Sequence, residues 1–282
     1  PTEIPEIRVL KKGMTNRSFL FRCRGTHYIM RIPGEGTREL INRRGEADVY
    51  AALAGRGISD DVLYINPENG YKISAFLEGA RTCDPMNEAD VRRCMAHLRA
   101  LHEQKLTVGH TFDLFGWIDF YQSLWHGAPS AYRDHAETSA HVRSLRPFLE
   151  SLALPPVLSH IDAVYDNFLF IPGEDGEDIR LIDWEYAGMQ DPHVDIAMFC
   201  VYAFYNRVQV DRLIDLYFPE GCADAMRVKI YGYIAACGLL WSNWCEYKRM
   251  LGVEFGEYSL RQYQYAKDYY QIVCRERERL GL

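Results

Sequence analysis

The most constraining feature of the sequence is the run from His160 to Glu185, which places oxygen-bearing side chains around a short apolar repeat. Two apolar runs, at 168–171 and 179–182, flank a segment rich in Pro, Gly, Asp and Glu, and this pattern predicts a β-hairpin. Antiparallel pairing sets the residue before the first strand beside the residue after the second. We therefore expect Asn167 and Asp183 to meet at one end of the ladder, close enough to share a metal ion.

Asp162 completes a set of three candidate functional side chains. In protein kinases one Asp positions the acceptor hydroxyl while an Asn and a second Asp hold the metals, and the spacing of Asp162, Asn167 and Asp183 is similar. Taken singly, such residues are ordinary in turns and caps. Taken together with the hairpin register, they predict a phosphoryl-transfer centre with Asp162 as base and Asn167 and Asp183 as magnesium ligands. We expect His160 to brace the loop through a hydrogen bond to backbone.

Length and composition bound the class of protein. A chain of 282 residues, 48% of them hydrophobic, can bury one large core or two lobes. The net charge of −7 argues against a nucleic-acid or anionic-membrane binder, because such proteins usually present a basic surface. Eight cysteines without a CxxC pair disfavour a zinc site and a disulfide framework. The longest apolar stretch, 231–241, is too short to span a bilayer, and we expect a soluble, cytoplasmic protein without membrane insertion.

The first third of the chain is predicted to be rich in strands. The expected strands are 7–10, 18–23, 27–32, 62–65 and 72–77, with a helical pattern at 39–53 between the third and the fourth. Three strands, a helix and two more strands is the order of a kinase-type small lobe. We place the lobe boundary at Glu78 and Gly79, so that residues 1–78 form an ATP-binding lobe and residues 79–282 a helical lobe.

Arg31 ends the third expected strand, at the place where a protein kinase carries a phosphate-contacting Lys. A planar, always-charged guanidinium suits phosphate oxygens, and Glu46 in the following helix could pair with it. The alternative is a surface Arg and a solvated Glu. The turn between the first two strands lacks the full GxGxxG pattern and is a weak signal. Its residues that could donate hydrogen bonds to phosphates are Gly13, Thr15, Asn16 and Ser18.

From Asn87 onward the chain is predicted to be mostly helical. Asn87 can cap a helix whose apolar residues keep a spacing near 3.6. Further helices are expected at 117–124, 141–152, 195–206, 210–218, 222–251 and 259–279. Aromatic residues are dense in the last two, where Trp241 and Trp244 lie three residues apart. Most of these rings are expected to pack in the core, and the alternative is a cage that attracts a quaternary ammonium by roughly 0.5–2 kcal/mol per ring.

The catalytic segments resemble those of the choline/ethanolamine kinases, a branch of the aminoglycoside-phosphotransferase-like kinases. The resemblance rests on residues 158–170, 181–188 and 191–197 and covers nearly the whole chain. Residues 28–37 and 40–43 particularly resemble the bacterial choline kinases, and residues 239–244 are similar to the paired-Trp helix that lines the choline pocket of the eukaryotic enzymes. The expected fold is α+β and protein-kinase-like, with a small five-stranded antiparallel lobe and a larger, mainly helical lobe.

Carried over by position, the resemblance implies roles for the catalytic residues. Asp162 would orient and deprotonate the alcohol, Asn167 and Asp183 would bind magnesium, and Glu185 would support the second metal or its waters.

For the nucleotide, the resemblance implies that Arg31 contacts the ATP phosphates, with Glu46 fixing it, beneath the loop at 13–18. The backbone from Ala75 to Leu77 would be the hinge that binds adenine. The residues implied for the choline pocket are Trp241, Trp244, Tyr202 and Tyr263.

We therefore predict transfer of the ATP γ-phosphoryl to the hydroxyl of choline, with Mg²⁺ and ATP as cofactors. The short connection from Asp183 to the helix near Asp195 favours a small-molecule acceptor over a protein substrate. Ethanolamine kinase is an alternative, although the primary ammonium of ethanolamine requires carboxylate or carbonyl hydrogen-bond acceptors as well as aromatic rings. An aminoglycoside phosphotransferase would need a strongly acidic cleft, and an inactive kinase-like binding module would not need the intact catalytic set. The sequence leaves the oligomeric state open.

Overall fold

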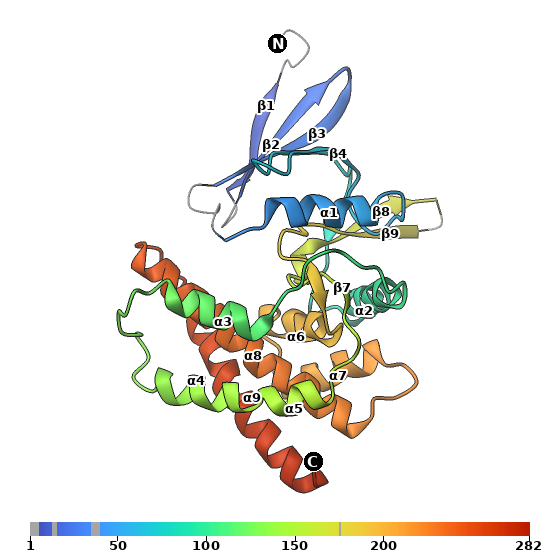
Figure 1. Ribbon diagram of the computed structural model, residues 1–282. Coiled ribbons are helices and arrows are strands. Elements are labelled where there is room, and N and C mark those ends of the chain that lie inside the picture. The colour runs from blue at the N-terminus through green and yellow to red at the C-terminus, as the bar shows by residue number, and fades with distance from the viewer. Residues whose placement is uncertain (1–5, 13–15, 35–39, 175) are drawn as a thin grey trace.

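The protein folds into a β-rich lobe above a larger helical lobe (Figure 1). The computed structural model describes residues 6–12, 16–34, 40–174 and 176–282, and of Lys11 and Lys12 it describes the backbone alone. This architecture agrees with the α+β fold class that the sequence predicts.

The small lobe is built on a five-stranded antiparallel sheet with the strand order β1-β2-β3-β5-β4. Its strands are β1 (Ile7–Lys12), β2 (Asn16–Cys23), β3 (Thr26–Pro33), β4 (Val62–Ile65) and β5 (Lys72–Ala75). All five predicted strands are confirmed, although β5 ends at Ala75, before the expected Leu77. The boundary proposed at Glu78 and Gly79 falls in the turn that follows, where Gly79 has a φ of 71°.

One helix, α1 (Arg43–Leu53), connects β3 to β4 and carries Glu46 in its first turn. It begins later than the predicted residue 39, because the side chain of Asn42 caps it by accepting the N–H of Gly45 at 3.0 Å. Residues 35–39 lie outside the described part of the chain.

The helical lobe contains α2 (Glu88–Glu103), α3 (Leu114–Ser123), α4 (His135–Ser144), α5 (Arg146–Ser151), α6 (His193–Tyr202), α7 (Arg207–Tyr217), α8 (Asp224–Met250) and α9 (Glu257–Leu280). The predicted cap of α2 is confirmed, since Asn87 accepts the N–H of Ala89 at 3.0 Å. The single helix predicted at 141–152 is wrong. Pro147 stands in the first turn of α5, and a proline, which lacks an N–H, is tolerated at the start of a helix and not in its interior.

The predicted hairpin is confirmed as β8 (Phe168–Gly173) and β9 (Gly176–Leu181), with Phe168 paired to Leu181. A one-turn 3-10 helix, η1 (Tyr165–Asn167), leads into it. Three short strands were not predicted, because two or three residues carry no detectable periodicity. They are β6 (Arg81–Thr82), which extends the hairpin sheet, and the pair β7 (Val157–Ser159) and β10 (Gly188–Gln190).

Helix α8 forms the centre of the helical lobe, and every residue from Val228 to Glu246 is buried. It packs against α9, α6 and α3. At Gly238 the two long helices touch so closely that a Cβ would lie 2.7 Å from the carbonyl oxygen of Gln262 and 2.8 Å from the amide nitrogen of Ala266. Within the described ranges, no helix has the length and apolarity needed to cross a membrane.

We expect Gly238→Ala to lower the free energy of unfolding by about 1–3 kcal/mol, because its methyl group would meet the backbone of α9 rather than a yielding side chain. Gly232→Ala on the same helix is the matched control. Its Cβ would meet the end of the Leu149 side chain, and a gain in helix propensity of about 1 kcal/mol offsets part of the cost. Urea denaturation of both variants checks this, and equal losses of stability would contradict the close approach of the helices.

Candidate active site

The loop between β7 and η1 is held by a buried carboxylate from α6. Asp195 accepts the N–H of His160 at 2.8 Å and the N–H of Ile161 at 2.7 Å, and it is fully buried. Ile161 has a φ of 69°, a left-handed conformation that a β-branched residue rarely adopts. The two hydrogen bonds therefore hold a strained loop and fix the direction of the next residue, Asp162.

His160 braces this loop against the segment that follows β9. Its Nε2 donates to the carbonyl of Ile182 at 2.9 Å, and its ring packs on Trp184 with a centroid separation of 4.5 Å. Burial lowers the pKa of His160 to about 4, so the ring is neutral near pH 7. The expected structural role of His160 is confirmed.

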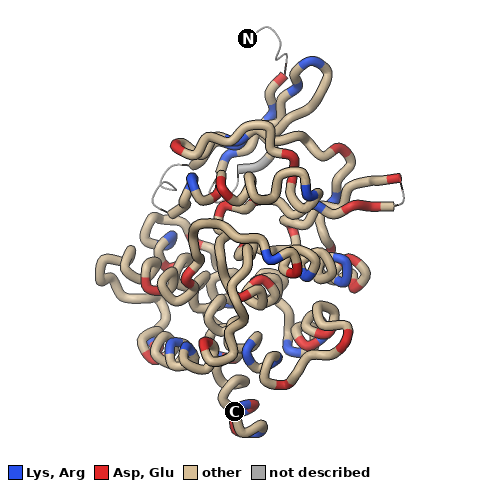
Figure 2. Tube along the Cα trace, turned by 45° about the vertical axis from the view of Figure 1, so that its right-hand side comes forward, with Lys and Arg blue, Asp and Glu red and all other residues tan. Residues whose placement is uncertain are grey.

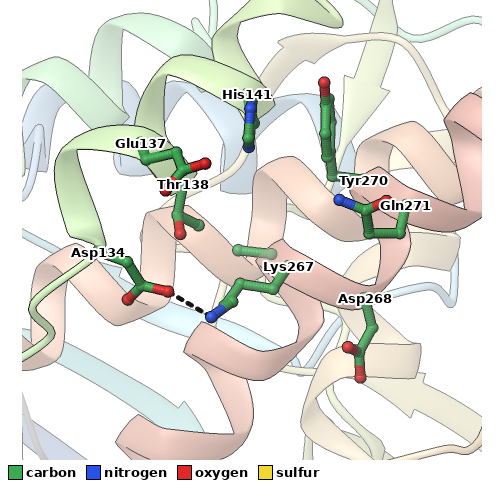
Figure 3. Close-up of a pocket in the computed structure, with 9 residues that line it drawn as sticks. Asp134, Glu137, Thr138, His141, Lys267, Asp268, Tyr270 and Gln271 are labelled. Carbon is green, nitrogen blue, oxygen red and sulfur yellow. Dashed lines mark hydrogen bonds and ion pairs between the residues drawn. The ribbon is translucent and has the colours of Figure 1, made fainter.

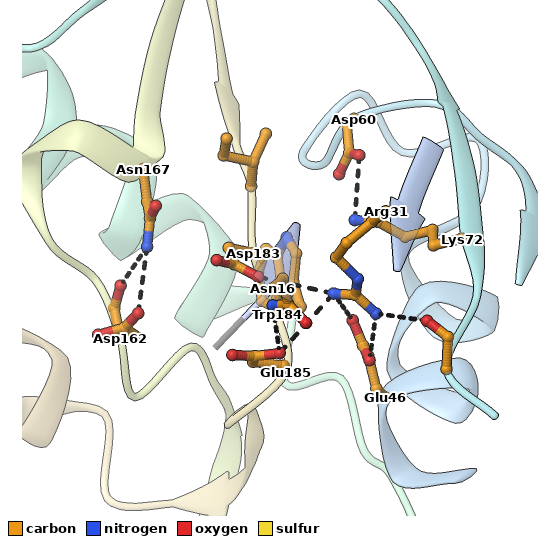
Figure 4. A network of polar contacts seen from close by, with 12 residues as sticks. Asn16, Arg31, Glu46, Asp60, Lys72, Asp162, Asn167, Asp183, Trp184 and Glu185 are labelled. Carbon is orange, nitrogen blue, oxygen red and sulfur yellow. Dashed lines mark hydrogen bonds and ion pairs between the residues drawn. The ribbon is translucent and has the colours of Figure 1, made fainter. Parts of the chain in front are cut away.

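Asp162 has one carboxylate oxygen that no described residue hydrogen-bonds (Figure 4). The Nδ2 of Asn167 donates to the backbone carbonyl of Asp162 at 2.9 Å and to its Oδ2 at 3.4 Å. Its Oδ1 is buried and has no hydrogen-bond partner among the residues that the structure describes. Burial, and then the nearby charge of Asp183, raise the pKa of Asp162 to about 8. Such a group can accept both a hydrogen bond and a proton.

Asp183 lies at the same end of the hairpin as Asn167. The N–H of Ile182 donates to the carbonyl of Asn167 at 2.9 Å, which confirms the predicted register. Asp183 itself has a φ of 67°. Burial, and then the charge of Glu185, raise the pKa of Asp183 to about 7, while Arg31, whose Nη1 lies 3.6 Å from its Oδ1, acts in the opposite direction.

Arg31 and Glu46 form a buried, two-pronged ion pair between β3 and α1. One prong joins Nη2 to Oε2 at 2.7 Å, the other joins Nη1 to Oε1, and Nη2 also donates to the carbonyl of Gly70 at 3.3 Å. Burial by itself would lower the pKa of Arg31, but the charge of Glu46 outweighs it and the pKa is raised. Burial likewise opposes ionisation of Glu46, whose pKa is nevertheless lowered by Arg31. The predicted pairing is present in the structure.

Arg43 extends this pair to the segment after β9 and was not singled out by sequence. Its Nη1 donates to Glu46 at 3.1 Å and to Oε2 of Glu185 at 3.0 Å. The same oxygen of Glu185 accepts from Nδ2 of Asn16 at 2.8 Å (Figure 4). Glu185 is thus tied to β2 and α1, and its support of a metal stays a prediction. The available signal was the i,i+3 spacing of Arg43 and Glu46 on one helix face.

Lys72 is a second cation that sequence reasoning missed. It lies opposite Arg31 in the β3–β5 ladder, is 6% exposed, and its Nζ contacts Oδ2 of Asp60 at 3.4 Å and the hydroxyl of Tyr50. Tyr50 stands one turn after Glu46 on α1. The helix is therefore pinned to two neighbouring strands by two buried cations.

Of the loop predicted to cover phosphates, Asn16 and Ser18 belong to β2, and Ser18 lies opposite Arg31 in the β2–β3 ladder. Gly13 and Thr15 lie outside the described residues.

The two residues predicted to form the hinge, Ala75 and Leu77, differ in how their backbone N–H groups are used. The N–H of Ala75 donates to the carbonyl of Asp61 at 2.9 Å and is used within the sheet. The N–H of Leu77, in contrast, donates to no backbone carbonyl in the described part of the chain. Sequence could not distinguish the two, because it does not reveal where the strand pairing stops.

Rings gather around Trp241 next to Asp162. The centroid of Trp241 lies 5.6 Å from that of Tyr202, 5.8 Å from that of Tyr186 and 6.1 Å from that of Trp244. The hydroxyl of Tyr202 lies near enough to Asp162 to oppose the rise of its pKa. The structure thus brings together three of the four residues implied for the acceptor pocket.

Tyr186 and Tyr258 were missed as members of this cluster. Tyr258 lies 5.9 Å from Tyr202 between ring centroids, and Tyr186 contacts Trp241 edge-on. Tyr186 directly follows Glu185, which was the signal that could have identified it.

Tyr263 lies elsewhere, and its place among the pocket residues needs correction. It stacks on Tyr132 at 3.9 Å, and its hydroxyl bonds to Thr138 at 2.8 Å and to Asp134 at 2.7 Å. Thr138, Asp134 and Lys267 line a polar pocket between α4 and α9, where Lys267 pairs with Asp134 (Figure 3). The composition of α9 did not reveal that this ring faces α4.

A small lobe whose Arg–Glu pair faces an Asp/Asn/Asp set on a helical lobe defines a kinase-like phosphotransferase. The model of the choline/ethanolamine kinase family matches residues 7–212. The chain belongs to this family of small-molecule kinases.

Known relatives resemble the chain along most of its length. Protein LicA of Haemophilus influenzae is 27% identical over 267 residues, which are 89% of this chain and 76% of the relative. The crystal structure of choline kinase LicA from Streptococcus pneumoniae is 28% identical, with a TM-score of 0.83 and coverage of 96% of this chain and 94% of that one. A structure of LicA in complex with AMP, also 28% identical, covers 95% and 94% with a TM-score of 0.80.

Aminoglycoside phosphotransferase APH(4)-Ia shares the fold, at 15% identity and a TM-score of 0.67, with coverage of 95% of each chain. Together with the LicA structures, this likeness confirms the protein-kinase-like fold class that the sequence predicts.

We expect Asp162→Asn to stabilise the nucleotide-free protein, and to do so more at high than at low pH. The folded pKa of about 8 exceeds the ordinary value of 3.8, so the wild type loses stability as pH rises through this window while the Asn variant does not. The free energy of unfolding of the variant should exceed that of wild type by about 1 kcal/mol or more near pH 8, and by less near pH 4. Denaturation curves at both pH values measure this.

The exposed Asp178→Asn serves as the control, since it removes a carboxylate without relieving a buried one. An Asp162→Asn variant no more stable than wild type near pH 8 would contradict the buried repulsion between Asp162 and Asp183.

Proposed function

We propose that the protein transfers the γ-phosphoryl group of ATP to the hydroxyl of choline, giving phosphocholine in a magnesium-dependent reaction. The observation that carries the proposal is the cluster of rings around Trp241 and Tyr202 beside the carboxylate of Asp162, one oxygen of which has no hydrogen-bond partner among the described residues. Ring faces attract a quaternary ammonium, and the adjacent carboxylate can receive the proton of its hydroxyl. Membership of the family and the likeness to choline kinase LicA support the same acceptor.

Asp162 is the proposed base. Its Oδ1 is buried without a partner among the described side chains, so a substrate hydroxyl can donate to it. A pKa near the working pH suits a proton acceptor. Because the charge of Asp183 contributes to the raised pKa of Asp162, compensation of that charge lowers the pKa of Asp162 and favours its ionised form. Phosphoryl transfer needs mainly positioning and charge neutralisation. The main role of the helical lobe is therefore to align the acceptor hydroxyl with Asp162.

Asn167 and Asp183 are the proposed magnesium ligands. The Nδ2 of Asn167 is turned toward Asp162, which leaves its Oδ1 facing away (Figure 4). An amide oxygen and a carboxylate are the hard ligands that Mg²⁺ prefers, with nucleotide phosphates completing its shell. When bound, Mg²⁺ neutralises charge on the β- and γ-phosphates. Glu185 stands beside them as the proposed support of a second metal.

Arg31 and the backbone of Leu77 are the proposed nucleotide contacts in the small lobe. The Nε of Arg31 is buried and lacks a hydrogen-bond partner in the described part of the structure, so it can donate to a phosphate oxygen while Glu46 holds both Nη atoms. The Leu77 N–H can donate to adenine. The LicA structure that contains AMP supports a nucleotide site in this fold.

Choline is favoured over the other acceptors by the chemistry of the rings. The primary ammonium of ethanolamine carries three N–H donors that require acceptors, whereas the contacts of Trp241 in this cluster are with other rings. An aminoglycoside carries several ammonium groups, whose N–H donors also require acceptors that aromatic rings do not supply. An inactive binding module would not require Asp162, Asn167 and Asp183 to converge.

A cytoplasmic location belongs to the same proposal. All eight cysteines are unpaired in the structure, which suits a reducing compartment. ATP is supplied there as well.

We expect the wild type to phosphorylate choline with a kcat/KM at least about tenfold above that for ethanolamine or kanamycin. In Trp241→Ala, loss of a ring face should raise the KM for choline about tenfold while the KM for ATP changes less than about threefold. Trp241→Phe keeps a ring face and should recover part of the loss. A coupled assay of ADP release with each acceptor measures these constants.

Preferential turnover of ethanolamine or kanamycin would overturn choline as the acceptor. A choline KM unchanged in Trp241→Ala would remove the ring cluster from the binding site.

A further inference from the structure

The buried carboxylate that holds the catalytic loop is itself held by a side chain of another helix. Acidic residues are spread over the helical lobe (Figure 2), and most of them are at least partly exposed, whereas Asp195 is fully buried. Its Oδ1 accepts the N–H of Ile161, and its Oδ2 accepts the N–H of His160. The Nε2 of His102 on α2 lies 3.0 Å from the same Oδ2. Because a carboxylate only accepts hydrogen bonds, this ring nitrogen carries a proton and is the donor.

The other nitrogen of the same ring is also engaged. The Nδ1 of His102 lies 2.8 Å from the hydroxyl of Tyr217, the last residue of α7. Burial raises the pKa of Tyr217, so its hydroxyl keeps the proton that it can donate to Nδ1. A partner on Nδ1 determines that the N–H of the ring faces Asp195. His102 and Tyr217 are each 5% exposed, so water has little access to either bond.

Three helices meet at this chain of hydrogen bonds. Helix α7 packs against both α2 and α6. The ring of Tyr217 contacts His193 in the first turn of α6, at 6.0 Å between ring centroids, and Phe218 at 4.9 Å, both edge-on. Rotation of Tyr217 away from His102 would therefore require these rings to repack. The hydroxyl of Tyr217 is thus a fixed end point for the chain.

We propose that His102 and Tyr217 are positioning residues for phosphoryl transfer, acting in series on the catalytic loop through Asp195. The inference rests on the proposed function, because it takes Asp162 as the base. Neither side chain is hydrogen-bonded to Asp162 in the described part of the structure, so their effect on the reaction passes through Asp195.

Loss of the third donor would act on the loop through the carboxylate. Without His102, an acceptor site on Oδ2 of Asp195 is left unsatisfied in the protein interior, which costs free energy. Rotation of the carboxylate toward another donor relieves this cost. The same rotation weakens the two backbone hydrogen bonds that hold Ile161 at a φ of 69°, directly before Asp162.

Steady-state kinetics of single and double variants test this chain. In His102→Leu, kcat should fall about tenfold, less than the hundredfold cost of a displacement of about 1 Å, because the two backbone hydrogen bonds to Asp195 remain. The KM values for ATP and acceptor should stay within about threefold of wild type. His102→Gln, whose amide NH₂ can donate to Asp195, should recover most of the lost kcat.

A double-mutant cycle tests whether Tyr217 acts through the ring of His102. Tyr217→Phe alone should lower kcat about threefold, and it should cause no further loss when it is added to His102→Leu. The matched control is Tyr231→Phe, which removes another buried hydroxyl that bonds to α7, at Asp211, and should leave kcat unchanged. Urea denaturation of every variant shows that it is folded under the conditions of the assay.

A folded His102→Leu variant that keeps the wild-type kcat would overturn the inference, because a merely structural histidine affects stability alone. Additive losses in the double variant would also overturn it, as would equal kcat values in Tyr217→Phe and Tyr231→Phe. The assay uses the acceptor that the wild type turns over fastest, so an acceptor other than choline would overturn the proposed acceptor alone. An Asp162→Asn variant that retains kcat would overturn the proposed base and this inference together.

Discussion

The geometry of the active site depends on one buried carboxylate. Asp195 accepts two successive backbone N–H groups of the catalytic loop, at 2.8 and 2.7 Å, and a third hydrogen bond at 3.0 Å from Nε2 of His102 on α2. The strained Ile161 is held in place by these bonds, and Asp162 follows it directly. Through His160, which bonds to the carbonyl of Ile182, the same anchor reaches the residue before Asp183. The base and the proposed metal ligand are therefore positioned together.

The second constraint is the chain of alternating charges that joins the lobes. It consists of four buried residues, each hydrogen-bonded to the next, in the order Arg31, Glu46, Arg43 and Glu185. Buried ion pairs seldom add net stability, since desolvation offsets most of their attraction. Here they hold α1 against the sheet and tie the small lobe to the segment that carries Asp183. The charged residues of the small lobe that face the proposed nucleotide site are therefore already held in position by these ion pairs.

The sequence was sufficient wherever local pairing decides the geometry. The register of the β8–β9 hairpin follows from two apolar runs and a turn, and it brings Asn167 beside Asp183. The Arg31–Glu46 pair follows from the order of strand and helix. Reasoning along the chain failed where a contact depends on how distant helices rotate against each other, as for Tyr263, whose ring faces α4. It also missed Lys72, because a lysine on a short strand gives no sign of burial until the helix that covers it is placed.

The most direct test of this account is the kinetics of Asp195→Asn. The substitution preserves the shape of the side chain but replaces one acceptor oxygen by an NH₂ group, so one of the backbone hydrogen bonds that hold Ile161 is lost. We predict that kcat falls about a hundredfold, the cost expected when a catalytic group is misplaced by about 1 Å. The KM for ATP should stay within about threefold of wild type, since the nucleotide contacts lie in the small lobe. A variant that retains the wild-type kcat would contradict the claim that Asp195 positions Asp162.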